Sequence, residues 1–140
     1  MISVTRLDIQ DSRALIAAAR VKADEIGVPM CIAITDDAGN LVAFERMDGG
    51  KVTSTTIAID KSYTASGAKK ATHEYGEASQ PGKPAYGISA AIGGRLMVVG
   101  GGLPVMVNGE CVGGIGVSSG TPAQDQVVAQ AGIDAFLASL

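Results

Sequence analysis

The spacing of apolar residues changes several times along the chain, and each change predicts a new element. Apolar positions recur at helical intervals over residues 5–27. The pattern Thr5-x-x-Asp8 resembles a capping box at the start of this segment, and Gly27 provides a stop at its end. Together these features predict a first helix over residues 5–27.

Residues 30–47 change to the two-residue period of β-strands. Met30, Ile32 and Ile34 share one face, and the turn-forming residues 36–40 separate them from a second run of the same kind. Two such runs joined by a short turn predict an antiparallel hairpin.

The segment from Thr53 to Lys70 returns to a helical pattern, but its face is built from small side chains. These are Thr56, Ala58, Ser62, Ala65, Ser66 and Ala68. Such a face lets another backbone approach closely, so we expect this middle helix near a pocket or a subunit contact. A short helix is expected over residues 72–78, and the prolines and glycine of residues 79–87 predict a loop.

Three strand candidates follow, over residues 95–102, 103–107 and 110–120. Asn108-Gly109 between the last two is a strong hairpin signal. A final helix completes the chain. This order predicts an α/β protein of the α+β kind, a single domain over residues 1–140, in which the first and last helices pack against one antiparallel sheet.

Gly114, Gly116 and Gly120 form a G-x-G-x-x-x-G pattern before the final helix, which opens on a capping box of Thr121 and Gln124. A dinucleotide site would need a parallel βαβ unit with a second strand after the helix. The tight hairpins predict antiparallel pairing instead, and we expect no room for that strand. We therefore interpret Gly113, Gly114 and Gly116 as a bulge or a close helix crossing, and the helix N-terminus as a candidate anion site.

Composition narrows the possible partners. Hydrophobic residues make up 46% of the chain and the formal net charge is −3. No basic block is longer than Lys69-Lys70, which argues against nucleic acid and anionic membranes. The apolar runs are too short for a membrane span, so we expect a cytoplasmic protein. Cys31 and Cys111 are expected to be buried thiols rather than a disulfide or a metal site.

Three segments carry a family resemblance: "DDAGNLVAFERMDGG", "AIDKSYTASGAKK" and "GGGLPVMVNGECVGGIGVSSGTPAQDQVVAQAG". They resemble the small haem-binding and haem-degrading domains of the GlcG and HbpS type, which are related to the C-terminal domain of PduO-type cobalamin adenosyltransferases. The resemblance implies a profilin-like fold, with a five-stranded antiparallel sheet flanked by helices, and assembly into homo-oligomers. It also implies a ligand site near the middle helix and the G-G-x-P strand, formed by Lys61, Gly101, Gly102, Pro104, Met47 and Asp48.

His73 is the only histidine of the chain. Its imidazole can ligate haem iron or act as an acid and base near neutral pH, or it can be a solvated side chain in a polar run. The chain has no histidine in the first helix or first hairpin. If haem binds, the ligand is expected to be His73, ahead of a tyrosine, Lys61 or Met47.

Lys61 and Asp125 are further candidates for chemistry. The Lys61 ammonium can bind a carboxylate, act as a base or form a Schiff base, and the alternative is an ion pair with Asp60 or Glu45. Asp125 lies in the first turn of the final helix, where a carboxylate complements the helix dipole or serves as a ligand.

Two functions remain open from the sequence. The first is a cytoplasmic oligomer that binds haem or a related tetrapyrrole. The second is a small-molecule enzyme or accessory factor of a catabolic pathway, in which Lys61, His73 or Asp125 transfers a proton on an anionic metabolite. The sequence contains no P-loop, no nucleophile elbow and no zinc-protease motif, which argues against NTPase and common hydrolase mechanisms.

Overall fold

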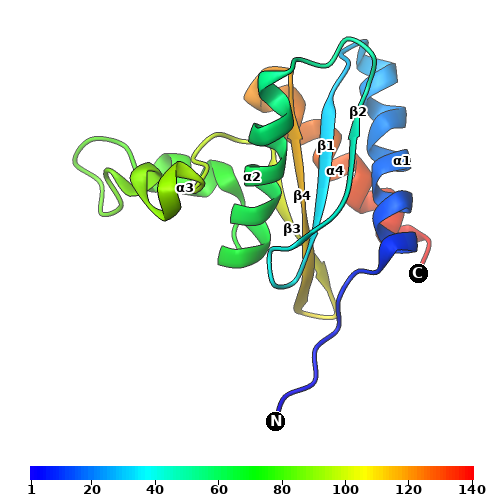
Figure 1. Cartoon of the computed structure of the whole chain (residues 1–140), viewed down its shortest axis with the longest axis horizontal. Coiled ribbons are helices and arrows are strands. Elements are labelled where there is room, and N and C mark those ends of the chain that lie inside the picture. The colour runs from blue at the N-terminus through cyan, green and yellow to red at the C-terminus, as the bar shows by residue number, and fades with distance from the viewer.

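One antiparallel sheet of four strands forms the centre of the molecule (Figure 1). The computed structural model describes residues 1–140, and the strands lie in the order β2-β1-β4-β3. They are β1 (Cys31–Asp36), β2 (Leu41–Arg46), β3 (Gly102–Val107) and β4 (Glu110–Ser118). All three pairings are antiparallel, as the predicted hairpins require.

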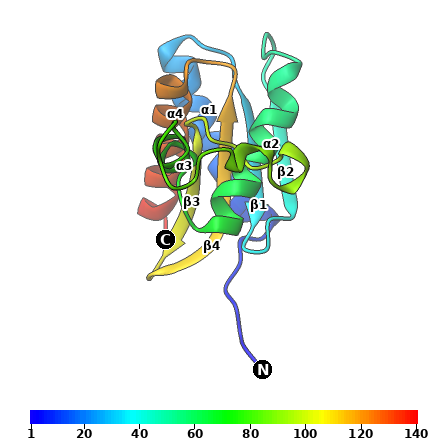
Figure 2. The same ribbon diagram turned by 90° about the vertical axis from the view of Figure 1, so that its left-hand side faces the viewer.

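Three long helices cover the two faces of this sheet (Figure 2). The pair on one face is α1 (Ile9–Ile26) and α4 (Pro122–Ala138), and the helix on the other face is α2 (Thr53–Ala68). The main hydrophobic core lies between the sheet and the α1–α4 pair, where Ile34 and Ile115 are fully buried. The α2 side has a smaller core with Ala33 and Ala58. The predicted packing of the first and last helices against the sheet is therefore confirmed.

The first helix begins after Asp8 rather than at Thr5. The Asp8 carboxylate accepts a hydrogen bond from the Asp11 N–H at 2.9 Å, and the Asp11 carboxylate accepts one from the Asp8 N–H at 3.0 Å. The Leu7 N–H donates to the Val112 carbonyl of β4, which holds the preceding segment outside the helix. The predicted capping box at Thr5 is therefore wrong, although the end at Gly27 is confirmed by its left-handed φ of +70°.

The first hairpin has the predicted form. One oxygen of the Asp36 carboxylate accepts hydrogen bonds from the Ala38 and Asn40 N–H groups, which closes the turn between β1 and β2. Cys31 at the start of β1 is buried, and Cys111 on β4 is half-buried. Both are free thiols, and burial raises the pKa of each above its ordinary value.

The glycines of β4 let α2 lie directly on the sheet. A Cβ atom on Gly116 would overlap the Ala58 carbonyl oxygen of α2, and one on Gly114 would lie 2.6 Å from the Ser62 carbonyl oxygen. The interpretation of these glycines as a close helix crossing is confirmed. The small face of α2 is therefore used within the same chain, because its neighbour is β4.

Residues 95–101 do not form the expected fifth strand. The Thr64 hydroxyl of α2 accepts a hydrogen bond from the Met97 N–H at 3.0 Å and donates one to the Arg95 carbonyl at 3.1 Å. These bonds tie residues 95–97 to α2, and the segment reaches the sheet at Gly101, whose carbonyl accepts a hydrogen bond from the Val117 N–H of β4. The prediction of five strands is wrong for this reason, and β3 remains an edge strand.

A short helix and a long connection project from the body of the molecule (Figure 1). The helix α3 (Thr72–Ala78) has the predicted bounds. Residues 79–95 follow as a connection with two short 3₁₀ turns, Ile88–Ala90 and Ile92–Gly94. Among the helices, none combines the length and apolar character needed to cross a membrane.

Candidate functional site

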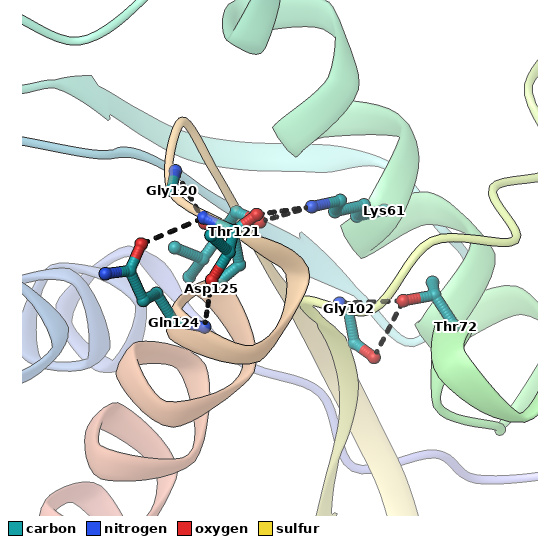
Figure 3. A network of polar contacts seen from close by, with 8 residues as sticks. Lys61, Thr72, Gly102, Gly120, Thr121, Gln124 and Asp125 are labelled. Carbon is teal, nitrogen blue, oxygen red and sulfur yellow. Dashed lines mark hydrogen bonds and ion pairs between the residues drawn. The ribbon is translucent and has the colours of Figure 1, made fainter. Parts of the chain in front are cut away.

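A buried ion pair joins the two helices that cover opposite faces of the sheet (Figure 3). Lys61 of α2 donates to the Asp125 carboxylate of α4 at 2.9 Å and to the Val117 carbonyl at 2.9 Å. The two charged side chains are only 1% and 3% exposed. The expected partners were different, since Asp60 pairs with Arg95 and Glu45 pairs with Arg20. The predicted ion pair of Lys61 is therefore present, but its partner is Asp125 instead of Asp60 or Glu45.

Burial shifts the pKa values of both groups toward their neutral forms. Loss of hydration lowers the pKa of Lys61, and the nearby Asp125 carboxylate opposes part of that shift. Loss of hydration likewise raises the pKa of Asp125, against the opposing effects of Lys61 and of the Gly120 N–H. The pair therefore depends on close contact, because either charge alone would be buried without compensation.

The N-terminus of α4 already uses several of its N–H donors within the chain, at the positions expected for an external anion. The Gly120 N–H donates to the Asp125 carboxylate at 2.8 Å. The Thr121 N–H donates to the Gln124 side chain at 2.9 Å, and the Gln124 N–H donates to the Thr121 hydroxyl at 3.2 Å, as the predicted capping box requires. A carboxylate of the chain itself takes the place predicted for an anionic ligand.

Gly101 and Gly102 pack against Lys61, as the family resemblance implies. Gly101 has a left-handed φ of +126°, and a Cβ atom there would lie 2.8 Å from the Lys61 Nζ. A Cβ atom on Gly102 would lie 2.5 Å from the Lys61 carbonyl oxygen. The Gly102 N–H also donates to the Thr72 hydroxyl at 2.9 Å, which fixes the start of α3 against β3. Sequence reasoning missed this role of Thr72, which no local pattern indicates.

Met47 and Asp48 lie apart from this cluster. The Met47 sulfur accepts a hydrogen bond from the Met30 N–H at 3.3 Å. Met47 and Asp48 line a hollow together with Arg20 and Arg46. No hydrogen bond or ion pair connects either of them to Lys61. The group implied by the family resemblance is therefore divided, because Met47 and Asp48 lie apart from Lys61 and Pro104 lines a different groove.

His73 and Pro104 meet in a groove between α3, β3 and α4. The groove has a volume of about 380 Å³. Its apolar wall includes Leu103, Ile133 and Leu137, and the ammonium-bearing residues Lys69 and Lys70 lie at its edge. In the sequence, Lys69-Lys70 stands out only as the longest basic block. The apolar wall is not predicted from the sequence, because its residues come from distant segments.

The His73 imidazole forms no hydrogen bond within the chain. Its Nδ1 is enclosed by protein atoms and has no hydrogen-bond partner. Unlike Nδ1, Nε2 retains exposed surface, and it forms no hydrogen bond within the chain. His73 is half-buried, with its Cβ against Gly100, so it is not a freely solvated surface side chain. An accessible imidazole nitrogen in an apolar groove is chemically suited to ligate a metal centre.

Residues 7–134 match the model of a family described as haem-degrading proteins of the HbpS-like type. The chain belongs to this family. It is 38% identical over 133 residues to an uncharacterized 15.0 kDa protein from the dhaT-dhaS intergenic region of Citrobacter freundii, covering 95% of this chain and 94% of that protein. It is 36% identical over 130 residues to the corrinoid adenosyltransferase PduO of Citrobacter freundii, covering 93% of this chain but 39% of PduO.

Solved structures of family members have the same fold. The protein ORFY of Klebsiella pneumoniae superposes with a TM-score of 0.96 at 37% identity, covering 99% of this chain and 95% of that one. A complex of PduOC with haem superposes with a TM-score of 0.89 at 34% identity, covering 94% of this chain and 95% of that one. Haem binding is thus a property of a relative that shares both the fold and a third of the sequence.

Proposed function

We propose that this chain binds haem or a related tetrapyrrole in the groove at His73, as a cytoplasmic homo-oligomer. The single observation that carries the proposal is the unbonded His73 imidazole in the wall of an apolar groove. Membership of the HbpS-like family and the haem complex of PduOC support the choice of ligand.

The residues of the groove fit the chemistry of haem. Haem presents a flat apolar ring, an iron that needs an axial ligand and two propionate groups. Leu103 and Ile133 offer apolar surface to the ring, Nε2 of His73 offers the ligand, and Lys69 and Lys70 offer cations to the propionates. The volume falls within the range of about 300–1,000 Å³ typical of small-molecule sites. When bound, haem would supply an iron centre for redox chemistry.

Other candidate ligands are less available. The Lys61 ammonium would have to leave Asp125 and the Val117 carbonyl, and its side chain is 1% exposed. The Met47 sulfur already accepts a hydrogen bond from Met30. The alternative function, proton transfer on an anionic metabolite, loses support for the same reason, because Lys61 and Asp125 neutralise each other in the interior and only His73 remains accessible.

Titration with hemin tests the proposal. The parent protein should give a saturable Soret band, and His73→Ala should abolish or shift it while leaving the far-ultraviolet circular dichroism unchanged. Added imidazole should restore the band in His73→Ala, because it replaces the missing ligand in the vacated space. Glu77→Ala serves as a matched control, since Glu77 is an exposed residue of the same helix α3 and lies outside the groove. Unaltered hemin binding by His73→Ala would exclude His73 as the ligand.

The proposed oligomer rests on the projecting connection of residues 79–95. Tyr86 on this connection is 70% exposed, so the segment that extends from the body offers a large aromatic side chain to a second copy of the chain. Gly101 and Gly102 offer no surface for such a contact, because other residues of the same chain cover them. Sedimentation equilibrium should give a multiple of 14.1 kDa. A single 14.1 kDa species at micromolar concentration would overturn the oligomer without affecting the haem proposal.

A further inference from the structure

A second pocket lies on the other side of α3 from the His73 groove. It has a volume of about 270 Å³ and is lined by Tyr63 and Gly67 of α2, Tyr75 of α3, and Ile92 and Leu96. His73 and Tyr75 are two residues apart on α3, so their side chains point in different directions around the helix. We propose that this pocket binds a small planar aromatic carboxylate, independently of the groove at His73.

Gly67 is the first observation that supports a ligand. Glycine destabilises a helix relative to alanine, so a helical glycine needs a reason. Gly132 of α4 has one, because a Cβ atom there would lie 3.1 Å from the Leu15 carbonyl oxygen, and Gly76 of α3 has one in the Val98 carbonyl. At Gly67 a Cβ atom would meet nothing within 4 Å, and the backbone is helical. Gly67 is exposed, and its missing side chain leaves the pocket open on this side of α2.

Ile92 is the second observation. This β-branched residue has a left-handed φ of +56°, a conformation that costs free energy for any residue with a branched side chain. Ile92 is 53% exposed, so the burial of its side chain does not explain the strain. Strained residues of this kind gather where a segment is held in place against a ligand. In this chain the strained residue forms part of the pocket wall.

The aromatic rings and a neighbouring cation define the class of ligand. The Arg95 guanidinium lies 3.9 Å from the centre of the Tyr63 ring, one of the two tyrosine rings in the lining. Arg95 lies beside the pocket rather than in its lining, stacked on Tyr63, and Nε is the only one of its guanidinium nitrogens that is bonded, to Asp60. Two tyrosine rings favour a flat aromatic body, and free donors on Arg95 favour a carboxylate beside it.

Binding of 2-naphthoate, measured by calorimetry, tests the site. The parent should bind it saturably, and Gly67→Met should weaken binding by about tenfold or more because the new side chain fills the pocket. The substitution removes a helical glycine, so the variant is expected to fold. Ala135→Met is the matched control, since it adds the same side chain to an exposed position of α4. The uncharged 2-naphthamide should bind more weakly than 2-naphthoate, as should cyclohexanecarboxylate, which lacks the aromatic ring.

Tyrosine resonances locate the bound probe. The chain has three tyrosines and no tryptophan, and two of the three line the pocket. In protein labelled with 3-fluorotyrosine, 2-naphthoate should move the ¹⁹F signals of Tyr63 and Tyr75 and leave that of Tyr86 in place. His73→Ala should bind the probe like the parent, which separates this result from the haem proposal.

Three outcomes would overturn the inference. The first is an absence of saturable naphthoate binding, and the second is equal binding by Gly67→Met and the parent. The third is a change in sedimentation mass in Gly67→Met but not in Ala135→Met, which would assign the pocket to a contact between copies of the chain.

Discussion

Lys61 and Asp125 lie 64 positions apart in the sequence, yet their side chains form a 2.9 Å ion pair that joins the helices on opposite faces of the sheet. The pair passes the point where Gly101 leads into β3, and no larger side chain than glycine fits beside the ammonium there. The ion pair therefore restricts the size of the side chain at position 101 as well as the charges at positions 61 and 125.

Removal of one partner should be more harmful than removal of both. Lys61→Met leaves the Asp125 carboxylate buried without its cation, and we expect a loss of about 3–5 kcal/mol in the free energy of unfolding. The double variant Lys61→Met/Asp125→Leu should recover most of this loss, apart from the cost of the unpaired Gly120 N–H. Urea unfolding of the four proteins gives the coupling energy. Additive effects of the two substitutions would contradict the prediction.

Stability should depend on pH with opposite signs in the two single variants. In Asp125→Asn the Lys61 ammonium loses its partner, and its folded pKa lies further below the ordinary value of 10.5. Between these two pKa values the unfolded chain binds more protons, so stability should rise with pH. In Lys61→Met the folded pKa of Asp125 lies above the ordinary value of 3.8, the folded chain binds more protons in that range, and stability should fall as pH rises. Urea unfolding over a pH series measures both slopes, and slopes of the same sign would exclude this account.

Two glycines should respond to alanine in opposite ways. Gly116→Ala places a methyl group against the Ala58 carbonyl of α2, and we expect a loss of about 1–3 kcal/mol or more from overpacking. Gly67→Ala places the same group in open space within a helix, and should stabilise the protein by about 0.5–1 kcal/mol. Thermal unfolding monitored by circular dichroism distinguishes the two, and a stabilising Gly116→Ala would mean that α2 does not lie so close to β4.

Lys69 should show a conflict between stability and binding. It ends α2 with a left-handed φ of +55°, where glycine fits better. Lys69→Gly should therefore raise the unfolding free energy slightly while weakening hemin binding by about two- to fivefold, as expected for an exposed ion pair. Hemin dimethyl ester, which lacks the propionate charges, should bind the parent and the variant equally. An equal loss for hemin and its ester would show that Lys69 acts through the shape of the groove instead.

Local signals predicted the helices and turns well because the interactions that set them are local. The capping box joins Thr121 to Gln124, and the Asn108-Gly109 turn joins two adjacent strands. In each feature the interacting residues lie within four positions of one another. The failure at residues 95–101 has the opposite cause. Val98 and Val99 favour a strand by composition, but the hydroxyl of Thr64, more than 30 residues away, takes the hydrogen bonds of the neighbouring backbone.

The candidate site was predicted less completely than the fold. The small face of α2 and the glycines of β4 correctly indicated a close crossing, since only missing side chains permit it. The partner of Lys61 and the wall of the His73 groove depend on which segments meet in space, and one sequence contains no signal for that. Thr5 was mistaken for the helix cap because Asp8 carries an equally good capping oxygen three residues later.

Pro104 has a consequence for what can attach to the free side of the sheet. β3 is an edge strand, and an unpaired edge ordinarily offers a row of N–H donors to any extended peptide that approaches it. Proline has no N–H group, so the row is interrupted at Pro104 and an incoming strand cannot bond along its whole length. Because Pro104 also lines the groove at His73, the residue that discourages growth of the sheet keeps the entrance to that groove clear of added backbone.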